Sequence, residues 1–291
     1  MSSIKLSYIL TSFNKLSYLS ITLPLLIENK KDDEEIVIID GGSTDGTVDY
    51  LQKLFAEKKI DQFVSEKDFG EAHGMNKAML IARGELIKII TDDDIYDYDC
   101  INECKQFMLA NNGIDILGSD GFGFNINHST YVYKQIDFIK GFEIWRSNKT
   151  PFLFCGLSFL IRKNSLAYMG LFNTNYKIVD IEYAIRVSSM KTKIAFYTGM
   201  SFVNIVNPNS NSHKFYETIA KERYQLEKLY PTFKNKISYK GSVIKFKEII
   251  SKSILKKPVT QNAKFDYKNI VEESLKKLHD HNTGKKFAFL T

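Results

Sequence analysis

The sequence predicts an α/β protein with an open, mostly parallel, twisted sheet that carries helices on both faces, followed by a helical C-terminal extension. Over residues 4–125, short apolar segments rich in β-branched residues alternate with longer segments of helical periodicity. Each apolar segment ends in a polar or acidic turn. The chain has 291 residues, 44% hydrophobic and 25% charged, which is ordinary for a globular protein with a sizeable core.

The expected strands and helices of the first half alternate along the chain. Strands are predicted for five short apolar segments, Leu6–Leu10, Ile36–Ile39, Gln62–Val64, Leu86–Ile90 and Asp115–Leu117. Helices are predicted for the four longer segments, Leu16–Ile27, Val48–Ala56, Ala72–Ala82 and Asp97–Ala110. Strands that alternate with helices are typical of a sheet whose strands run parallel.

The second half follows a looser pattern. Leu157–Ile161 and Ile194–Tyr197 are predicted as strands, Ile181–Ser189 as a helix, and residues 207–212 as a turn-rich break. Residues 234–291 contain 14 lysines and five acidic residues, whereas the other residues hold 26 basic and 29 acidic side chains. We therefore expect a main domain over residues 1–205 and a basic, helical C-terminal region over residues 206–291.

Composition and motifs disfavour several protein classes. No segment reaches the roughly 18 uncharged apolar residues of a membrane-spanning helix, and the N-terminus looks like a first strand rather than a signal peptide. Cys100, Cys104 and Cys155 are too few for a disulfide framework or a four-ligand zinc site. The chain has neither a G-x-G-x-x-G fingerprint nor a P-loop. We expect a cytoplasmic protein that is neither a Rossmann dehydrogenase nor a P-loop kinase or ATPase.

Four polar loops are expected to meet at one edge of the sheet. They follow the first four predicted strands and comprise Thr11–Asn14, Asp40–Thr47, Ser65–Gly70 and Thr91–Asp94. In an open parallel sheet, the carboxyl ends of the strands lie at the same edge, and ligands bind there. Polar and acidic groups from distant parts of the sequence should therefore form one site.

The sharpest chemical feature is the run Asp92-Asp93-Asp94. Three adjacent carboxylates repel one another, so a fold is expected to hold them together with the help of a counter-cation. Oxygen ligands of this kind suit Mg²⁺ or Mn²⁺, which commonly link one or two carboxylates to a phosphate. The alternative is a solvated acidic turn that favours the start of the next helix. The position of the run at the ligand edge favours the metal site.

Four motifs occur in order and together resemble one enzyme family. They read TSFN, EIVIIDGGSTDGT, SEKDFGEAHGMNKAM and ARGELIKIITDDDIY. This set resembles family 2 of the nucleotide-sugar glycosyltransferases over about residues 4–205. The resemblance implies a GT-A fold with a donor-binding half over about residues 1–125 and an acceptor half over about 126–205. It also implies an inverting transfer in which a divalent cation, bound by a D-x-D element, holds the donor diphosphate.

The resemblance also assigns positions for donor binding. Thr11 and Phe13 are expected to line the nucleobase pocket, with Asp40 hydrogen-bonding the base. Contacts to the base, ribose or diphosphate are expected from the side chains of Asp68, Asn76 and Lys77.

The resemblance assigns the metal ligands as well, with one departure. Many relatives have an acidic residue where this chain has Thr91, so the first ligand of the usual D-x-D element is missing. Asp93 matches the final aspartate of that element and is expected to coordinate the cation beside the donor. Asp92 is expected to help at both the metal and the donor, and Asp94 at the metal.

The second half supplies a catalytic base by the same resemblance. Gly170–Asn173, followed by Val179–Glu182, resembles the G-x-F-(D/N) segment of the family and its downstream acidic base. Asp180 is expected to remove the proton of the acceptor hydroxyl during attack, with Glu182 as the second choice. The alternative is that Asp180 only favours the N-terminus of its helix.

The expected function is a metal-dependent inverting glycosyltransferase, a hexosyltransferase-type enzyme of class EC 2.4 with Mn²⁺ or Mg²⁺ as cofactor. It would move a hexose or N-acetylhexosamine from a nucleotide sugar to a saccharide or lipid-linked acceptor in bacterial surface-polysaccharide or glycan synthesis. UDP is the favoured nucleotide, with GDP and dTDP open. A non-catalytic module that binds nucleotide sugars is the alternative, because of Thr91. Nucleic-acid binding by the basic tail is disfavoured by the acidic edge of the main domain.

Residues 241–258 are the distinctive part of the basic region. Apolar residues from Val243 to Leu255 recur near helical spacing, with lysines among and just after them, and Pro258 follows. Such a helix can lie in the interface of an anionic membrane, which would place the protein peripherally on the inner face of the cell membrane. Alternatively, the apolar stripe packs on the main domain or in a homodimer.

Overall fold

The computed structural model describes residues 4–126, 133–206, 214–233 and 266–291. The strands are β1 Leu6–Ser12, β2 Glu34–Asp40, β3 Gln62–Ser65, β4 Leu86–Ile90, β5 Ile95–Tyr96, β6 Ile116–Asn125, β7 Tyr133–Ile136, β8 Leu160–Arg162, β9 Ile194–Val206 and β10 Phe289–Leu290. The helices are α1 Leu16–Asn29, α2 Thr47–Ala56, α3 Glu71–Ile81, α4 Tyr98–Ala110, α5 Ile139–Asn148, α6 Leu166–Met169, α7 Val179–Ser189, α9 Tyr216–Leu229 and α11 Tyr267–Asn282. Two short 3-10 helices, η1 Gly156–Ser158 and η2 Lys163–Ser165, flank β8.

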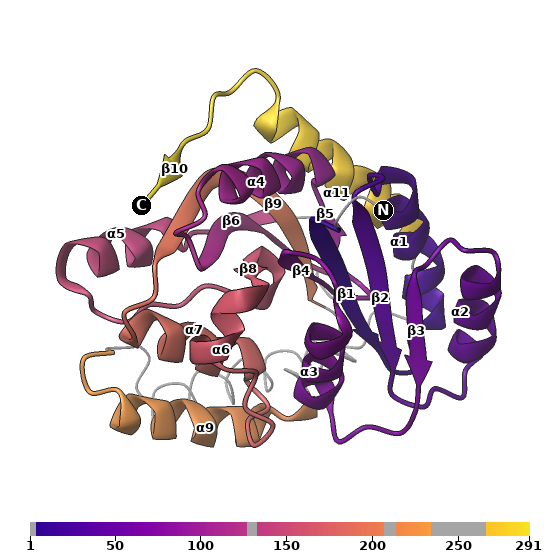
Figure 1. Ribbon diagram of the computed structural model, residues 1–291, viewed down its shortest axis with the longest axis horizontal. Helices are drawn as coiled ribbons and strands as arrows, with labels where there is room; N and C mark the ends of the chain where they lie inside the picture. Colours follow the sequence, from indigo (N-terminus) through magenta and orange to yellow (C-terminus); the bar gives the residue numbers. More distant parts are fainter. Residues whose placement is uncertain (1–3, 127–132, 207–213, 234–265) are drawn as a thin grey trace, which may run out of the picture.

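The strands form one sheet in the order β10-β9-β6-β8-β4-β1-β2-β3, with β5 paired to β9 and β7 paired to β6 (Figure 1). β3, β2, β1 and β4 are parallel neighbours, and β6 also runs parallel to β9. β8 runs antiparallel between β4 and β6. The predicted α/β fold with an open, mostly parallel sheet is confirmed. β2 and β4 are buried at every position, as strands covered on both faces require.

The predicted strand Leu157–Ile161 is only partly correct. The Ser158 amide donates to the Cys155 carbonyl at 2.9 Å, and the Phe159 amide donates to the Gly156 carbonyl at 3.0 Å. These bonds close the η1 turn and use backbone groups that a strand would direct to its neighbours. The strand therefore begins later, at Leu160.

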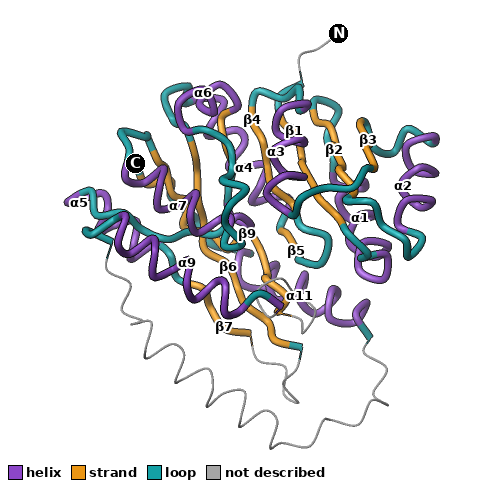
Figure 2. The backbone as a smooth tube through the Cα atoms, turned by 90° about the horizontal axis from the view of Figure 1, so that it is seen from below, coloured by secondary structure: helices purple, strands orange, loops and turns teal. Residues whose placement is uncertain are grey.

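Helices cover both faces of the sheet. On one face, α3, α5 and α7 pack side chains such as Met75, Trp145 and Tyr183 against the strands. On the other face, α1, α2 and α4 pack Leu23, Leu51 and their apolar neighbours. Figure 2 views the molecule from the side on which α3, α7 and α9 lie. Because both faces are covered, the ends of the strands are the natural place for a ligand.

The described part of the C-terminal region is joined to the main sheet. β10 pairs antiparallel with β9, and α11 packs against β9, β5 and α1 (Figure 1). Tyr267, Ile270, Val271 and Leu278 form the buried stripe of α11. Within the described residues, no helix has both the length and the apolar character required to cross a bilayer. The predicted turn at 207–212 and the predicted membrane segment at 241–258 lie outside the described residues.

Candidate active site

The acidic run lies where β4 ends. Asp94 is buried, and the side chains of Asp92 and Asp93 are only 12% and 13% exposed. The Ser12 hydroxyl, at the end of β1, donates to Asp92 Oδ2 at 3.1 Å, and the Thr22 hydroxyl of α1 donates to the Asp92 carbonyl at 2.9 Å. The structure thus brings the loops after β1 and β4 together at one edge of the sheet.

Lys15, at the start of α1, places a positive charge against this run. Lys15 Nζ lies 2.6 Å from Asp93 Oδ2 and 3.9 Å from Asp92 Oδ1. It also lies 5.0 Å from the centre of the Tyr18 ring. Burial alone would lower the pKa of Lys15, but the charges of Asp92 and Asp93 outweigh it and raise this pKa. Lys15 is therefore an ammonium ion that offsets part of the negative charge.

The two buried carboxyls of the run have raised pKa values. Burial, followed by the charge of Asp93, raises the pKa of Asp92 to about 7 despite the opposing effects of Lys15 and Ser12. The same two causes, in the same order, raise the pKa of Asp94 well above its usual value. A cation bound by Asp92 would compete with a proton, so cation binding should release protons near neutral pH.

Both carboxylate oxygens of Asp94, predicted as a helper at the metal, accept hydrogen bonds from the protein. Its Oδ2 atom accepts from the Thr91 hydroxyl at 2.6 Å. Its Oδ1 atom accepts from the Ile205 amide at 2.6 Å and from the Asn204 side chain at 3.3 Å. The Oδ1 atom therefore holds the loop after β4 onto β9, and the Oδ2 atom closes a contact within the loop. Thr91, which replaces the usual acidic residue, takes part in this structural contact.

Thr11 and Asp68 lie together against two glycines. Asp68 Oδ2 would be 2.8 Å from a Cβ atom on Gly41 and 3.3 Å from one on Gly74. A Cβ atom on Gly74 would also be 3.0 Å from the Thr11 methyl group. The Gly70 amide donates to Asp68 Oδ1 at 2.8 Å. The glycines thus allow the end of β1, the loops after β2 and β3, and the start of α3 to approach one another closely.

Phe13 and Asp40, both predicted at the nucleobase, occupy contrasting positions. Phe13 is 59% exposed on the loop after β1, where its ring can stack on a base. Asp40 is fully buried and accepts four hydrogen bonds, from the amides of Gly42 and Ser43 and the hydroxyls of Ser43 and Ser65, over 2.5–2.9 Å. Asp40 therefore orders the loop. A base contact would have to use the remaining acceptor position on its Oδ1 atom.

Asn76, predicted to contact the donor, makes two hydrogen bonds within the protein. Its side chain donates to the Phe172 carbonyl at 2.8 Å and accepts from the Phe172 amide at 2.9 Å. These two hydrogen bonds join α3 to the segment that leads into α7. Lys77 differs, because its Nζ atom lies 2.6 Å from Oε1 of the exposed Glu66. Lys77 can exchange that solvated partner for a phosphate.

Asp180, the predicted base, lies in the first turn of α7. Its Oδ2 atom accepts from the Gly156 amide at 3.1 Å, and its Oδ1 atom accepts from the Ile181 amide at 2.8 Å. Burial raises the pKa of Asp180, and the Gly156 and Ile181 amides oppose this rise. A carboxylate whose pKa moves toward neutrality is a stronger base.

Glu182, the second choice, is engaged as an ion-pair partner. It is buried, and its two oxygens lie 2.8 Å from Nε and 3.1 Å from Nη2 of Arg186. Arg186 also donates to the carbonyls of Met169 and Leu171. Glu182 thus helps to fasten α7 to the segment before it. Asp180 is the better candidate for the base.

Cys155 lies beside the turn that contacts the start of α7. Burial raises the pKa of the Cys155 thiol, and the charges of Asp180 and, more weakly, Asp94 raise it further. Gly156, the next residue, donates to Asp180. The turn at 155–156 therefore contacts the start of α7.

Asp92 and Asp93 fit a small divalent cation. Within the part of the chain that the structure describes, no three His, Cys, Asp or Glu side chains form a ready-made metal site. The Lys15 ammonium, 2.6 Å from Asp93, takes the place that a bound cation would have, because it is a positive charge held by this pair of carboxylates. Small divalent ions often take one or two carboxylates and complete their shell with phosphate oxygens and water.

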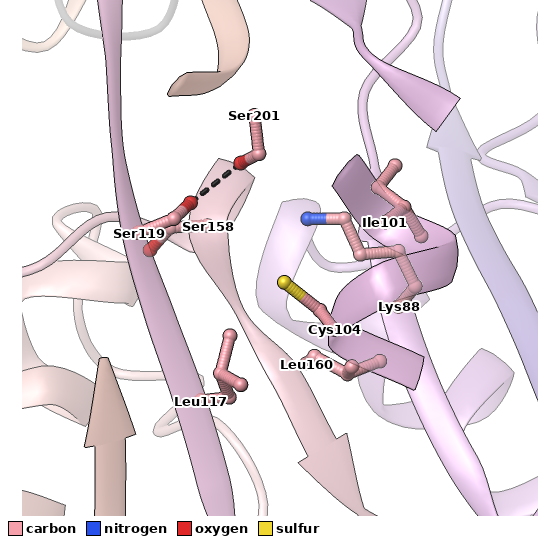
Figure 3. A pocket seen from close by; sticks show the side chains of 8 residues that line it. All are labelled: Lys88, Ile101, Cys104, Leu117, Ser119, Ser158, Leu160 and Ser201. Carbon is pink, nitrogen blue, oxygen red and sulfur yellow. Dashed lines mark hydrogen bonds between the residues drawn. The ribbon is translucent and has the colours of Figure 1, made fainter. Parts of the chain in front are cut away.

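A small internal cavity lies apart from these loops, between the sheet and α4 (Figure 3). It is lined by Lys88, Ile101, Cys104, Leu117, Ser119, Ser158, Leu160 and Ser201. Burial lowers the pKa of Lys88 to about 8, and the Lys88 ammonium donates to the Leu157 carbonyl. The Ser119 and Ser201 hydroxyls contact each other at 2.5 Å. Ser158 of the η1 turn lines the cavity, and none of its lining residues belongs to the four predicted donor loops.

Two residues at the acidic run were missed by the sequence analysis. Lys15 directly follows the polar TSFN loop, and that position is the signal that could have found it. The Tyr267 hydroxyl donates to the Asp93 carbonyl at 2.8 Å, and its ring meets that of Tyr18 edge to face at 4.8 Å. No local pattern marks Tyr267, because it follows Asp93 by 174 residues.

Comparison with solved structures supports the fold. The chain matches a crystal structure of S. aureus TarS 1–349 in complex with UDP-GlcNAc, with a TM-score of 0.54, 18% identity, and coverage of 75% of this chain and 66% of that chain. It also matches the mannosyltransferase PcManGT from Pyrobaculum calidifontis in complex with GDP-Man and Mn²⁺, with a TM-score of 0.54, 18% identity, and coverage of 76% and 64%. At such identities the likeness establishes the fold alone, which is GT-A.

Sequence comparison supports the family. The teichuronic acid biosynthesis glycosyltransferase TuaG of Bacillus subtilis is 29% identical over 125 residues, which are 40% of this chain and 48% of TuaG, so the match spans about half of that relative. A PGL/p-HBAD biosynthesis glycosyltransferase of Mycobacterium bovis is 23% identical over 195 residues, 66% of this chain and 72% of that protein. The family model described as glycosyl transferase family 2 matches residues 7–170. Because this match covers more than half of the chain, the protein belongs to glycosyl transferase family 2.

Proposed function

We propose that this protein is a metal-dependent, inverting hexosyltransferase of bacterial surface-polysaccharide or glycan synthesis. It would transfer a hexose or N-acetylhexosamine from a nucleotide sugar to a hydroxyl of a saccharide or lipid-linked acceptor. The observation that supports the proposal is the pair Asp92 and Asp93, which lies with the Lys15 ammonium at the end of β4. Asp180, at the start of α7, accepts from the Gly156 amide and is the proposed base. Relatives named for teichuronic acid and PGL/p-HBAD biosynthesis support the assignment to surface glycans.

The proposed chemistry divides the site into two sides. A divalent cation on Asp92 and Asp93, when bound, would neutralise the diphosphate leaving group. Asp180 would accept the proton of the attacking hydroxyl on the opposite face of C1, which inverts the anomeric configuration. Thr11, Phe13 and the other donor loops would hold the nucleotide, and much of the rate gain would come from this alignment.

UDP is the proposed nucleotide, and it can be tested directly by ligand-induced stabilisation. TarS was crystallised with UDP-GlcNAc and PcManGT with GDP-Man and Mn²⁺, so both nucleotides belong in the test. Thermal-shift measurements should pair UDP, GDP or dTDP with Mn²⁺, Mg²⁺ or EDTA. We expect UDP with Mn²⁺ to raise the unfolding temperature, and EDTA to remove the shift, because a ligand stabilises the folded state that binds it. Absence of a metal-dependent shift with every nucleotide would contradict the proposal.

A non-catalytic module that binds nucleotide sugars is the second candidate. It is favoured by the structural use of Thr91 and Asp94, which leaves fewer carboxylates for a metal than the usual motif offers. Measurement of donor hydrolysis with Mn²⁺ separates the two. Release of UDP from a UDP-sugar supports the enzyme, whereas tight donor binding without any release supports the module.

The proposed peripheral membrane location rests on residues 241–258, and its test must spare α11. Deleting the chain from residue 241 would also remove α11 and β10, which pack on the main sheet. A better variant changes five lysines to glutamine, at Lys245, Lys247, Lys252, Lys256 and Lys257. We expect it to lose binding to anionic vesicles at low salt, because each basic residue adds attraction to the surface.

The matched control for this experiment changes five exposed lysines of the described surface to glutamine, at Lys53, Lys58, Lys140, Lys191 and Lys221. The control has the same net charge as the test variant. If both variants lose vesicle binding equally, general charge rather than residues 241–258 is responsible. If neither loses it, the membrane proposal is wrong.

A further inference from the structure

We propose that Lys15 is an internal counter-ion that occupies the cation position of the site until the donor arrives, and then moves its ammonium onto the donor diphosphate. This inference rests on the proposed function, because it assumes that Asp92 and Asp93 hold a divalent cation. It assigns Lys15 two tasks, which are to oppose metal binding in the absence of donor and to bind the diphosphate in its presence. Together they make binding of the metal and of the nucleotide mutually dependent.

The contacts of the ammonium carry the first task. Lys15 Nζ lies 2.6 Å from Asp93 Oδ2 and 3.9 Å from Asp92 Oδ1, so it stands between the two carboxylates that fit the metal. The side chains of all three residues are 12–19% exposed, so this pair is shielded from solvent more than a surface salt bridge. A divalent cation at Asp93 would be repelled by an ammonium held at that distance. The metal must therefore displace Lys15 from Asp93.

The backbone around Lys15 is fixed while its side chain can swing. The Asn14 amide donates to the Ser43 hydroxyl at 2.8 Å, and the Leu16 amide donates to Asp45 Oδ2 at 3.0 Å. Residues on both sides of Lys15 are thus fastened to the loop after β2. The lysine side chain has four rotatable bonds and ends in a compact charge. The ammonium can therefore change partners around a stationary Cα atom.

The surroundings indicate where the displaced ammonium goes. A phosphate oxygen bound to the same small cation as Asp93 would be separated from that carboxylate by the cation alone. It would therefore lie within reach of the Lys15 ammonium. The Tyr18 ring, 5.0 Å from Nζ, provides a flanking face that attracts a cation. Tyr18 in turn packs edge to face on Tyr267, whose hydroxyl holds the Asp93 carbonyl. These contacts fix the Tyr18 ring beside the acidic run, where it can flank the ammonium.

Binding measurements on Lys15→Met test the inference, since methionine keeps the length of the side chain and removes its charge. Mn²⁺ alone should bind the variant more tightly than the wild type, by about tenfold, because no ammonium competes. UDP with saturating Mn²⁺ should bind it about tenfold more weakly, the scale of one lost charge-assisted hydrogen bond. The enhancement of UDP affinity by Mn²⁺ should fall accordingly, because coupling between two ligands is reciprocal. Free Mn²⁺ can be followed by electron paramagnetic resonance and UDP by calorimetry.

Two further variants make the result specific. Lys15→Arg keeps the charge and its affinity for phosphate, so it should retain weak binding of Mn²⁺ alone and most of the UDP affinity. Lys53→Met, at an exposed lysine of α2 with 75% of its side chain accessible, should behave as the wild type. All variants are first checked for an unchanged unfolding temperature.

The outcomes separate this inference from the proposed function. If Lys15→Met leaves either affinity unchanged while the wild type binds Mn²⁺ and UDP cooperatively, the inference about Lys15 is overturned and the metal site stands. If the wild type shows no effect of Mn²⁺ on UDP binding, the proposed metal-dependent function itself has failed. Opposite changes in the two affinities, with rescue by arginine, are the result that the structure leads us to expect.

Discussion

Replacing Asp180 with asparagine should lower the rate of sugar transfer by about 10²-fold or more, the usual scale for the loss of a general base. Donor affinity should change little, because the donor loops belong to the first four strands and Asp180 lies on α7. Steady-state transfer assays, together with calorimetric titration of the donor in the presence of Mn²⁺, measure both quantities. If transfer persists in Asp180→Asn and is abolished in Glu182→Gln, Glu182 is the base instead.

A matched control and a pH profile distinguish the base from a helix-stabilising carboxylate. Asp49 is an exposed acidic residue in the first turn of α2, so Asp49→Asn removes the same favourable charge from a helix start without affecting transfer. Burial raises the pKa of Asp180, so the group is protonated and inactive below that value. The kcat/KM of the wild type should therefore rise with pH, with a midpoint above the usual aspartate value near 4. This acidic limb should disappear in Asp180→Asn.

Replacing Asp93 with asparagine should remove the Mn²⁺-dependent part of donor binding and reduce transfer to background. A neutral amide is a weak ligand for a hard divalent cation, whereas the carboxylate contributes charge as well as an oxygen. The fold should survive, because the Asp93 backbone is held through its carbonyl by Tyr267 and the neighbouring Asp94 anchors the loop to β9. Titration of UDP with Mn²⁺ and with EDTA in place of metal measures the loss.

Asp99→Asn is the control for this change, because Asp99 is an exposed aspartate six positions along the chain, in the first turn of α4. It should leave Mn²⁺-dependent UDP binding unchanged. Equal Mn²⁺-dependent affinity in the wild type and Asp93→Asn would mean that Asp93 does not hold the metal. A large fall in the unfolding temperature of Asp93→Asn would instead show that this carboxylate is structural, as Asp94 is.

The first half of the fold could be predicted well because its patterns are local. The apolar run Leu86–Ile90 is a strand with those same bounds, since five consecutive apolar or long side chains between polar turns leave few alternatives. The second half was harder, because the backbone of residues 155–159 closes a 3-10 turn before the strand begins. Its own backbone hydrogen bonds close the turn, and the Gly156 amide also donates to Asp180, 24 positions along the chain, a contact that no repeating pattern in the sequence marks.

The site residues show the same division. The type and order of the polar loops indicated an acidic, cation-collecting edge, and the structure brings Ser12, Asp92 and Asp93 together there. The sequence could not reveal which carboxylates have oxygens left for a ligand. The oxygens of Asp94 accept hydrogen bonds from Thr91 and Ile205, and the Asn76 side chain donates to the Phe172 carbonyl. Adjacent residues of identical chemistry thus take different roles according to which neighbours the fold gives them.

The sequence by itself determined the α/β class, the parallel direction of the first strands and the gathering of acidic loops at their carboxyl ends. These features follow from hydrophobic periodicity and turn chemistry, which act over a few residues. Only the tertiary structure decided which charge meets which. It set the Lys15 ammonium against Asp93, placed the Asp180 carboxylate against the Gly156 amide, and brought Tyr267 to the acidic run across 174 residues of chain. Such pairings depend on distances through space, and these exist only after the layers of the fold have packed.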